Sequence, residues 1–209
     1  MAKSERRSKD NDKQGVAKAP SSSVEEIKSW IEDLPSHQPA EWNKLPDIGL
    51  YMDQVLTLMD RQLTLYKRVD EGKLLTQPMI NNYTKDGLLP RASDKKYSQS
   101  HLALLTVLCS LKPVLSIADL TEVLRYSRTD GQDDALYALF LETQRDAISK
   151  AAGNLVEELE NVRSSINNEA AAKKGEMMKR ELAHVAMQMA IEARVRIMMT
   201  QKIIDTIRS

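Results

Sequence analysis

The stretch from residue 75 to residue 97, LTQPMINNYTKDGLLPRASDKKY, constrains the fold most, because proline and glycine mark both ends of one short helix. Pro78 suits the first turn of a helix, where no backbone N–H is needed, and Gly87 suits the left-handed residue that ends a helix. The two residues therefore predict a helix of about two turns. Pro90 follows, and after it comes a short loop rich in basic residues.

This predicted helix has an apolar face and a polar face. At about 100° per residue, the apolar face is formed by Met79, Ile80 and Tyr83. The polar face carries Asn81 and Lys85, with Asn82 at its flank. Asparagine suits bidentate hydrogen bonding to adenine in the major groove of DNA, and lysine suits guanine or phosphate. The spacing alone fits equally well a capped surface helix whose polar residues face water.

Basic residues are concentrated in this part of the chain. Residues 73–97 contain five basic and two acidic residues, a local charge of +3, whereas the whole chain has a net charge of +0. The basic residues are Lys73, Lys85, Arg91, Lys95 and Lys96. Because the excess is local, it predicts a directed positive patch.

Several sequence runs resemble the DNA-binding domain of MerR-type winged-helix regulators. They are INNYTKDGLLP (80–90), KKY (95–97), HLALLTVLCSLK (101–112) and LSIADLTEVL (115–124). With IGLYMDQV (48–55) added, the chain is more similar still to an uncharacterised bacterial family, a domain of unknown function with the same variant of the winged helix. The resemblance covers residues 45–126. It implies a winged helix-turn-helix fold and double-stranded DNA as a partner.

The resemblance also implies roles for single residues. Tyr83 matches the aromatic residue of the family's recognition helix and Lys85 the basic residue after it, while Lys95 and Tyr97 match the arginine and tyrosine of the wing. Asn81, Asn82 and Lys85 are expected to face bases. The residues expected to hold phosphates or to shape the wing are Tyr83, Arg91, Lys95, Lys96 and Tyr97.

The sequence departs from the MerR pattern in two places. Asn81 and Asn82 stand where most MerR proteins have arginine and tyrosine, and the wing, residues 91–96, is short. These departures, with the zero net charge, favour a second hypothesis: a helical adaptor or regulatory subunit that binds a protein partner. The first hypothesis is a sequence-specific, dimeric transcriptional regulator.

The chain as a whole predicts a mainly α protein in four parts. Residues 1–21 lack apolar periodicity and predict a disordered basic tail, which either keeps the protein in solution or weakly attracts nucleic acid. Residues 22–46 predict an amphipathic helix and a linker. Residues 47–127 predict the winged helix-turn-helix domain, and residues 132–209 predict two long helices for dimerisation or sensing.

Caps and turns set the boundaries inside these parts. The first helix of the domain is expected to start at Asp47. Ser98 or Ser100 is expected to cap the apolar helix after the wing, and Ser116 the helix that follows. The connection formed by residues 67–75 is longer than the usual helix-turn-helix turn. Residues 129–133, TDGQD, indicate a turn and a domain boundary.

The last segment, residues 170–207, is long and rich in methionine. Its apolar positions form a seam: Met178, Leu182, Val185, Met189, Ala193, Ile197, Ile204 and Ile207. The seam fits three arrangements, namely a homodimer formed across a two-fold axis, an adaptable pocket for an unknown effector, and packing against the chain's own core.

Other function classes lack their residue patterns. His37, His101 and His184 have no second ligand at metal-binding spacing, the glycines are isolated, and no nucleophile elbow is present. We therefore expect no enzyme, no metal and no cofactor. The single cysteine, Cys109, lies in an apolar run and is expected to be a buried thiol. No apolar stretch reaches the roughly 20 residues that span a bilayer, so we expect a cytoplasmic protein without membrane contact.

Overall fold

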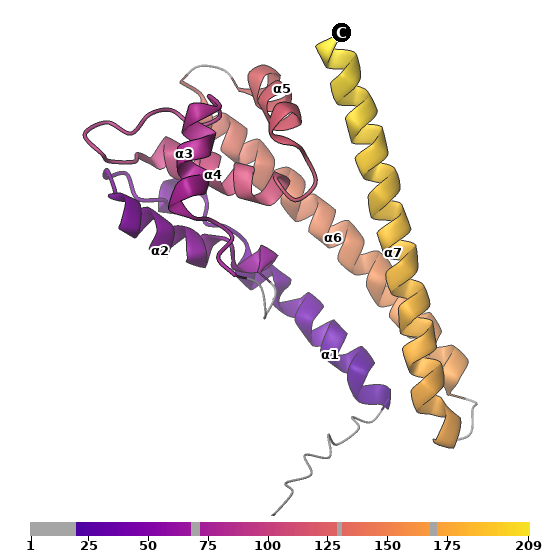
Figure 1. Ribbon diagram of the computed structural model, residues 1–209. Helices are drawn as coiled ribbons and strands as arrows, with labels where there is room; N and C mark the ends of the chain where they lie inside the picture. Colours follow the sequence, from indigo (N-terminus) through magenta and orange to yellow (C-terminus); the bar gives the residue numbers. More distant parts are fainter. Residues whose placement is uncertain (1–19, 68–71, 129–130, 168–170) are drawn as a thin grey trace, which may run out of the picture.

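The computed structural model describes residues 20–67, 72–128, 131–167 and 171–209, and within them the chain has seven α-helices and no strand (Figure 1). The helices are α1 (Pro20–Asp33), α2 (Met52–Gln62), α3 (Gln77–Lys85), α4 (Gln99–Leu111), α5 (Ile117–Ser127), α6 (Asp133–Ile166) and α7 (Ala171–Arg208). Three short 3₁₀ helices are η1 (Leu34–His37), η2 (Trp42–Lys44) and η3 (Thr64–Tyr66). The predicted mainly α fold with long carboxy-terminal helices is confirmed. No helix in these ranges is long and apolar enough to cross a membrane.

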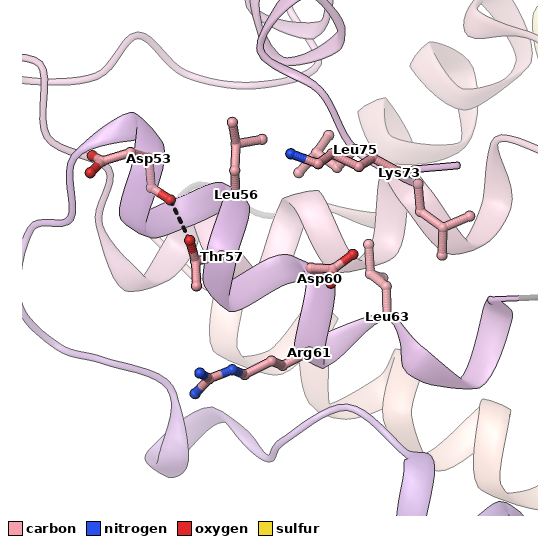
Figure 2. A pocket seen from close by; sticks show the side chains of 9 residues that line it. Asp53, Leu56, Thr57, Asp60, Arg61, Leu63, Lys73 and Leu75 are labelled. Atoms are coloured by element: carbon pink, nitrogen blue, oxygen red, sulfur yellow. Dashed lines mark hydrogen bonds between the residues drawn. The ribbon is translucent and has the colours of Figure 1, made fainter. Parts of the chain in front are cut away.

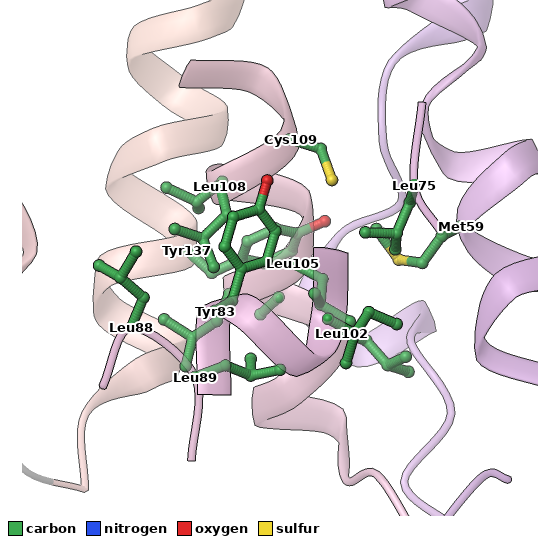
Figure 3. Close-up of a cluster of buried hydrophobic side chains, with 14 of the residues drawn as sticks. Met59, Leu75, Tyr83, Leu88, Leu89, Leu102, Leu105, Leu108, Cys109 and Tyr137 are labelled. Carbon is green, nitrogen blue, oxygen red and sulfur yellow. The ribbon is translucent and has the colours of Figure 1, made fainter. Parts of the chain in front are cut away.

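Helix α4 lies at the centre of the larger hydrophobic core. Every residue from 101 to 109 is buried, so α4 is covered all the way round. The side chains packed around it come from α2, α3, α5 and α6, and many of them are drawn in Figure 3. Cys109 is 8% exposed, and burial raises the pKa of its thiol to about 12. The prediction of a buried thiol is confirmed.

A smaller core joins α1 to the long helices. It is formed by Val24, Ile31, Leu159, Val162, Ile166, Met178 and Val185. Two ion pairs border this core: Lys28 pairs with Glu160, and an Arg163 guanidinium nitrogen lies 3.2 Å from a Glu25 carboxylate oxygen. The amphipathic helix predicted near the amino end therefore packs on the second half of α6 and the first half of α7.

The far end of α7 returns to the larger core. Ile204 is 1% exposed and belongs to that core, and Arg208 donates to an Asp119 carboxylate oxygen at 3.0 Å. In the middle of α7 the predicted seam is not covered by the rest of the chain: Met189 is 41% exposed. Met178, Val185 and Ile204 thus pack against the chain's own core, which was one of the three arrangements considered, whereas Ile207 is 41% exposed.

Two helix boundaries differ from prediction. Helix α2 begins at Met52 rather than at Asp47, because Leu50 exchanges backbone hydrogen bonds with Tyr97 (N–H to carbonyl, 2.9 and 2.8 Å). A backbone group used in such a pair cannot also form a helical bond. Helix α1 begins earlier than residue 22, at Pro20. The predicted caps are confirmed: Ser98 precedes α4, and Ser116 accepts from the Asp119 N–H at 3.1 Å.

Parts of the expected loops fall outside the described residues. These are residues 1–19 of the predicted tail, 68–71 of the connection before α3, 129–130 of the predicted turn, and 168–170 before α7.

Candidate functional site

Backbone hydrogen bonds fix the carboxy end of α3. The Leu88 N–H donates to the Tyr83 carbonyl at 2.9 Å, and the Gly87 N–H donates to the Thr84 carbonyl at 3.3 Å. Gly87 has a φ of 76°, a conformation that glycine adopts without steric cost. This pair of bonds is the Schellman motif, which stops a helix at a left-handed residue. Helix α3 therefore ends where the sequence predicts.

The apolar face of α3 is built into the larger core. Ile80 is 0% exposed and Tyr83 is 2% exposed, and Figure 3 shows the Tyr83 ring inside the cluster. Burial raises the pKa of Tyr83 to about 12, and its buried hydroxyl has no hydrogen-bond partner among the described residues. Tyr83 therefore cannot reach a phosphate, which corrects that part of its predicted role. Its place on the same face as Ile80 makes it a support for α3.

The opposite face of α3 is open. Asn81, Asn82 and Lys85 are all exposed, and in the described structure none of their side chains forms a hydrogen bond or an ion pair. Two amides and one ammonium group are thus presented together on a helix whose other face is fixed. They can donate and accept hydrogen bonds toward a partner without giving up an existing contact.

Residues 93–96, in the segment where the sequence predicts a wing, form a tight turn that carries basic residues. The Lys96 N–H donates to the Ser93 carbonyl at 2.8 Å, and Asp94 and Lys95 have φ values of 50° and 62°. Two successive left-handed residues are typical of the type I′ turn that joins paired segments. Arg91, Lys95 and Lys96 are exposed. The turn therefore presents Lys95 and Lys96 to solvent, and the third predicted cation, Arg91, is exposed just before it.

Tyr97 and His101 anchor this turn to the domain. Tyr97 is 8% exposed and pairs with Leu50 through the backbone. Its ring meets the His101 ring edge-on, with centroids 5.4 Å apart, and the Ser98 N–H donates to His101 Nδ1 at 3.1 Å. The Tyr97 side chain is therefore too deeply placed to hold a phosphate, and its role in shaping a wing stays a prediction.

Two residues that hold this turn in place, Gly49 and His101, were not predicted to have this role. A Cβ added to Gly49 would lie 2.9 Å from the Lys96 Cβ. The backbone at residue 49 can therefore lie this close to Lys96 only because residue 49 is glycine. His101 stands three residues after Ser98, which is the spacing of a capping box, and that signal could have revealed its role. No local pattern marks Gly49, because its neighbour Lys96 is distant in sequence.

A hollow of about 410 Å³ lies between α2 and the segment before α3. Figure 2 shows Asp53, Asp60 and Arg61 on α2 and Lys73 on the facing segment. Its charges are of both signs, so the hollow attracts neither anions nor cations strongly. In the part of the chain that the structure describes, no group of three or more histidine, cysteine, aspartate or glutamate side chains could hold a metal ion.

Replacing Gly49 by alanine should weaken the anchoring of the turn. The new methyl group must displace Lys96, and we expect a loss of about 1 to 3 kcal/mol in the free energy of unfolding, measured by urea denaturation. Gly153→Ala, in α6 and with no neighbouring atom within 4 Å, is the control and should stabilise by about 0.5 to 1 kcal/mol. Equal stability of Gly49→Ala and the wild type would contradict the close approach.

The pKa of His101 should make stability depend on pH. Burial lowers this pKa below its usual value of 6.5, the backbone carbonyls of Pro90 and Arg91 oppose the shift, and charges on Asp133 and Arg128 act in opposite directions. Because the unfolded chain binds the proton more tightly, His101 contributes stability above pH 6.5 that is lost as the pH falls toward its folded pKa.

We therefore expect the free energy of unfolding to fall between pH 7 and pH 5, and to fall less in His101→Asn. The asparagine oxygen can still accept from the Ser98 N–H but does not titrate. His184→Asn, at an exposed histidine of α7, is the control. The same pH dependence in His101→Asn as in the wild type would exclude His101 as the source.

No curated protein and no solved structure matches the chain. Residues 40–142 match a family described as a domain of unknown function, DUF1836. The match takes in α2 to α5 and the start of α6, and leaves out α1 and α7. The resemblance to a domain of unknown function is confirmed for these residues, so α3 and the basic turn lie within a domain similar to DUF1836.

Proposed function

We propose that the chain is a sequence-specific DNA-binding transcriptional regulator in which α3 reads bases and the turn at residues 93–96 binds the neighbouring phosphates. One observation carries the proposal: Asn81, Asn82 and Lys85 are exposed and have no partner within the described chain, on a helix whose other face is buried. Because the backbone of α3 is already fixed, binding to a groove has to order only the exposed side chains.

The dimensions of an α-helix suit this role. With its side chains a helix is about 10–12 Å across, and the major groove of B-DNA, about 12 Å wide, admits it. Helix α3 has nine residues. Asparagine pairs with the N6 and N7 atoms of adenine, and lysine with guanine or phosphate. These side chains therefore suit direct reading of bases, while Lys95 and Lys96 suit the phosphate backbone.

The winged helix-turn-helix is part of the same proposal. Its support is the order of the elements: α2, α3, a tight basic turn, and then the core helix α4. The backbone pairing of Leu50 with Tyr97 gives further support, because it joins the segment before α2 to the end of the turn. The regulator would act in the cytoplasm as a homodimer through its carboxy-terminal helices, reading two half-sites and responding to an effector not yet identified.

A second candidate function is a helical adaptor that binds protein. Ile48 and Tyr51, which precede α2, are 66% and 50% exposed, and the Lys96 ammonium lies 5.6 Å from the centre of the Tyr51 ring. Aromatic side chains such as Tyr51 are enriched in protein interfaces. If binding to DNA hardly changes with salt, the adaptor is favoured, because phosphate contacts release counterions and are strongly salt-dependent.

Asn82→Ala should reduce affinity for a preferred DNA site by roughly 1 to 3 kcal/mol and relax its sequence preference. The measurement is a fluorescence anisotropy titration with a preferred site and with random DNA. Asn154→Ala, which removes an exposed amide from α6, is the matched control and should change neither. An equal loss on both DNAs for Asn82→Ala would rule out base reading by this residue.

Lys95→Asn should weaken binding to all DNA sequences alike and lower the slope of log affinity against log salt by about 1. Asparagine is chosen because it tolerates the left-handed conformation of residue 95. Lys150→Asn on α6 removes an exposed lysine elsewhere and should leave the slope unchanged. The phosphate role fails if both variants behave alike.

A further inference from the structure

Helix α7 carries a second apolar stripe on the side that faces away from α6. Its packed side includes Met178 and Val185, which are 5% and 8% exposed. Met187, Ile191 and Met198 are 59%, 57% and 54% exposed, and at about 100° per residue they lie on the opposite side. Figure 1 shows α7 at the outside of the bundle, with no helix beyond it. A helix that packs on its own chain alone needs only one apolar stripe.

This outward stripe continues in both directions with a regular period. Arg180 lies seven residues before Met187, Asp205 lies seven residues after Met198, and Arg194 lies between Ile191 and Met198 at spacings of three and four. All of these residues are exposed. With His184 and Gln201, which fill the two remaining positions, the row from Arg180 to Asp205 has the three- and four-residue spacing with which two helices pack along their length, and its three apolar members lie in the middle. Single apolar residues are normal on a protein surface, so the argument for a partner depends on the shared register of Met187, Ile191 and Met198 together with the charges around them.

The charges on the stripe distinguish the two ways in which a second copy can lie. In a parallel pair, Arg180 and Arg194 would each lie beside the same residue of the other copy, and like charges would repel. In an antiparallel pair centred between residues 192 and 193, Arg180 lies beside Asp205 of the second copy. Met187 then packs against Met198, and Ile191 packs against the aliphatic part of Arg194. Arg180 and Asp205 also pair within their own chain, with Glu181 and Arg208, and their attraction between copies arises only in the antiparallel orientation.

We propose that the outward stripe of α7 is an interface with a second copy of this chain, in which the two α7 helices pair antiparallel over residues 180–205. The contact would run for about 38 Å. It is symmetric, so each copy contributes the same surface, as in most closed dimers. The proposal specifies how the dimer of the proposed function forms, and to that extent it rests on that function. The face of α7 involved is not the predicted seam but the opposite one.

The first test is the oligomeric state of the full chain in Met187→Glu/Met198→Glu. These residues face each other in the antiparallel pair, so the double variant brings carboxylates together at both layers. By sedimentation velocity over a range of micromolar concentrations we expect a wild-type dimer and a dissociation constant raised roughly 100-fold in the variant. The control is Met199→Glu/Ile203→Glu, which adds the same charge at side chains that are 62% and 61% exposed on another face of α7, and it should remain dimeric.

The second test fixes the orientation. Met187→Cys and Met198→Cys are prepared separately, mixed, and treated with a short bis-maleimide crosslinker. The antiparallel pair predicts crosslinked dimers in the mixture and very few in either variant alone, whereas a parallel pair predicts efficient crosslinking of each variant with itself. The wild type controls for the buried Cys109.

A wild-type monomer at all concentrations, or equal dissociation of the stripe variant and its control, would overturn the interface. Self-crosslinking of the single variants would overturn the antiparallel orientation. Neither measurement uses DNA, so the interface and the proposed reading of bases can fail independently.

Discussion

The burial of α4 on all its sides is the constraint on which the rest of the domain depends. Because residues 101–109 are covered all round, the neighbouring helices must each turn an apolar face toward α4. For α3, that face contains Ile80 and Tyr83, both almost completely buried. Its remaining face is then fixed in direction, and it is the face with two amides and a lysine. The core thus determines which side chains α3 presents.

The same helix also holds the basic turn. His101 lies in the first turn of α4, accepts a hydrogen bond from the Ser98 N–H and supports the ring of Tyr97. Tyr97 in turn pairs with Leu50 at the start of the domain. Helix α3 and the turn therefore share one support, and a change at α4 should affect both parts of the proposed interface together.

Local chemistry explains which features could be predicted from the sequence. Pro78 and Gly87 bound α3, and Ser98 and Ser116 precede α4 and α5, because caps act within a few residues. The start of α2 could not be predicted in this way, since Leu50 fits a helical period and only its pairing with distant Tyr97 excludes it. The second stripe of α7 was missed because Arg180, Arg194 and Asp205 interrupt its apolar residues. The burial of Tyr97 could not be predicted either, because it depends on how its ring packs against His101.

The most direct test of the proposed function is recovery of genomic DNA fragments by the purified full-length protein, with Asn81→Ala/Asn82→Ala in parallel. Both asparagines are exposed, so the variant should remain folded, which circular dichroism can check. We predict that the wild type enriches a short inverted repeat and that the double variant does not. If the folded wild type enriches no sequence, or if the variant enriches the same one equally well, α3 does not read DNA through these side chains.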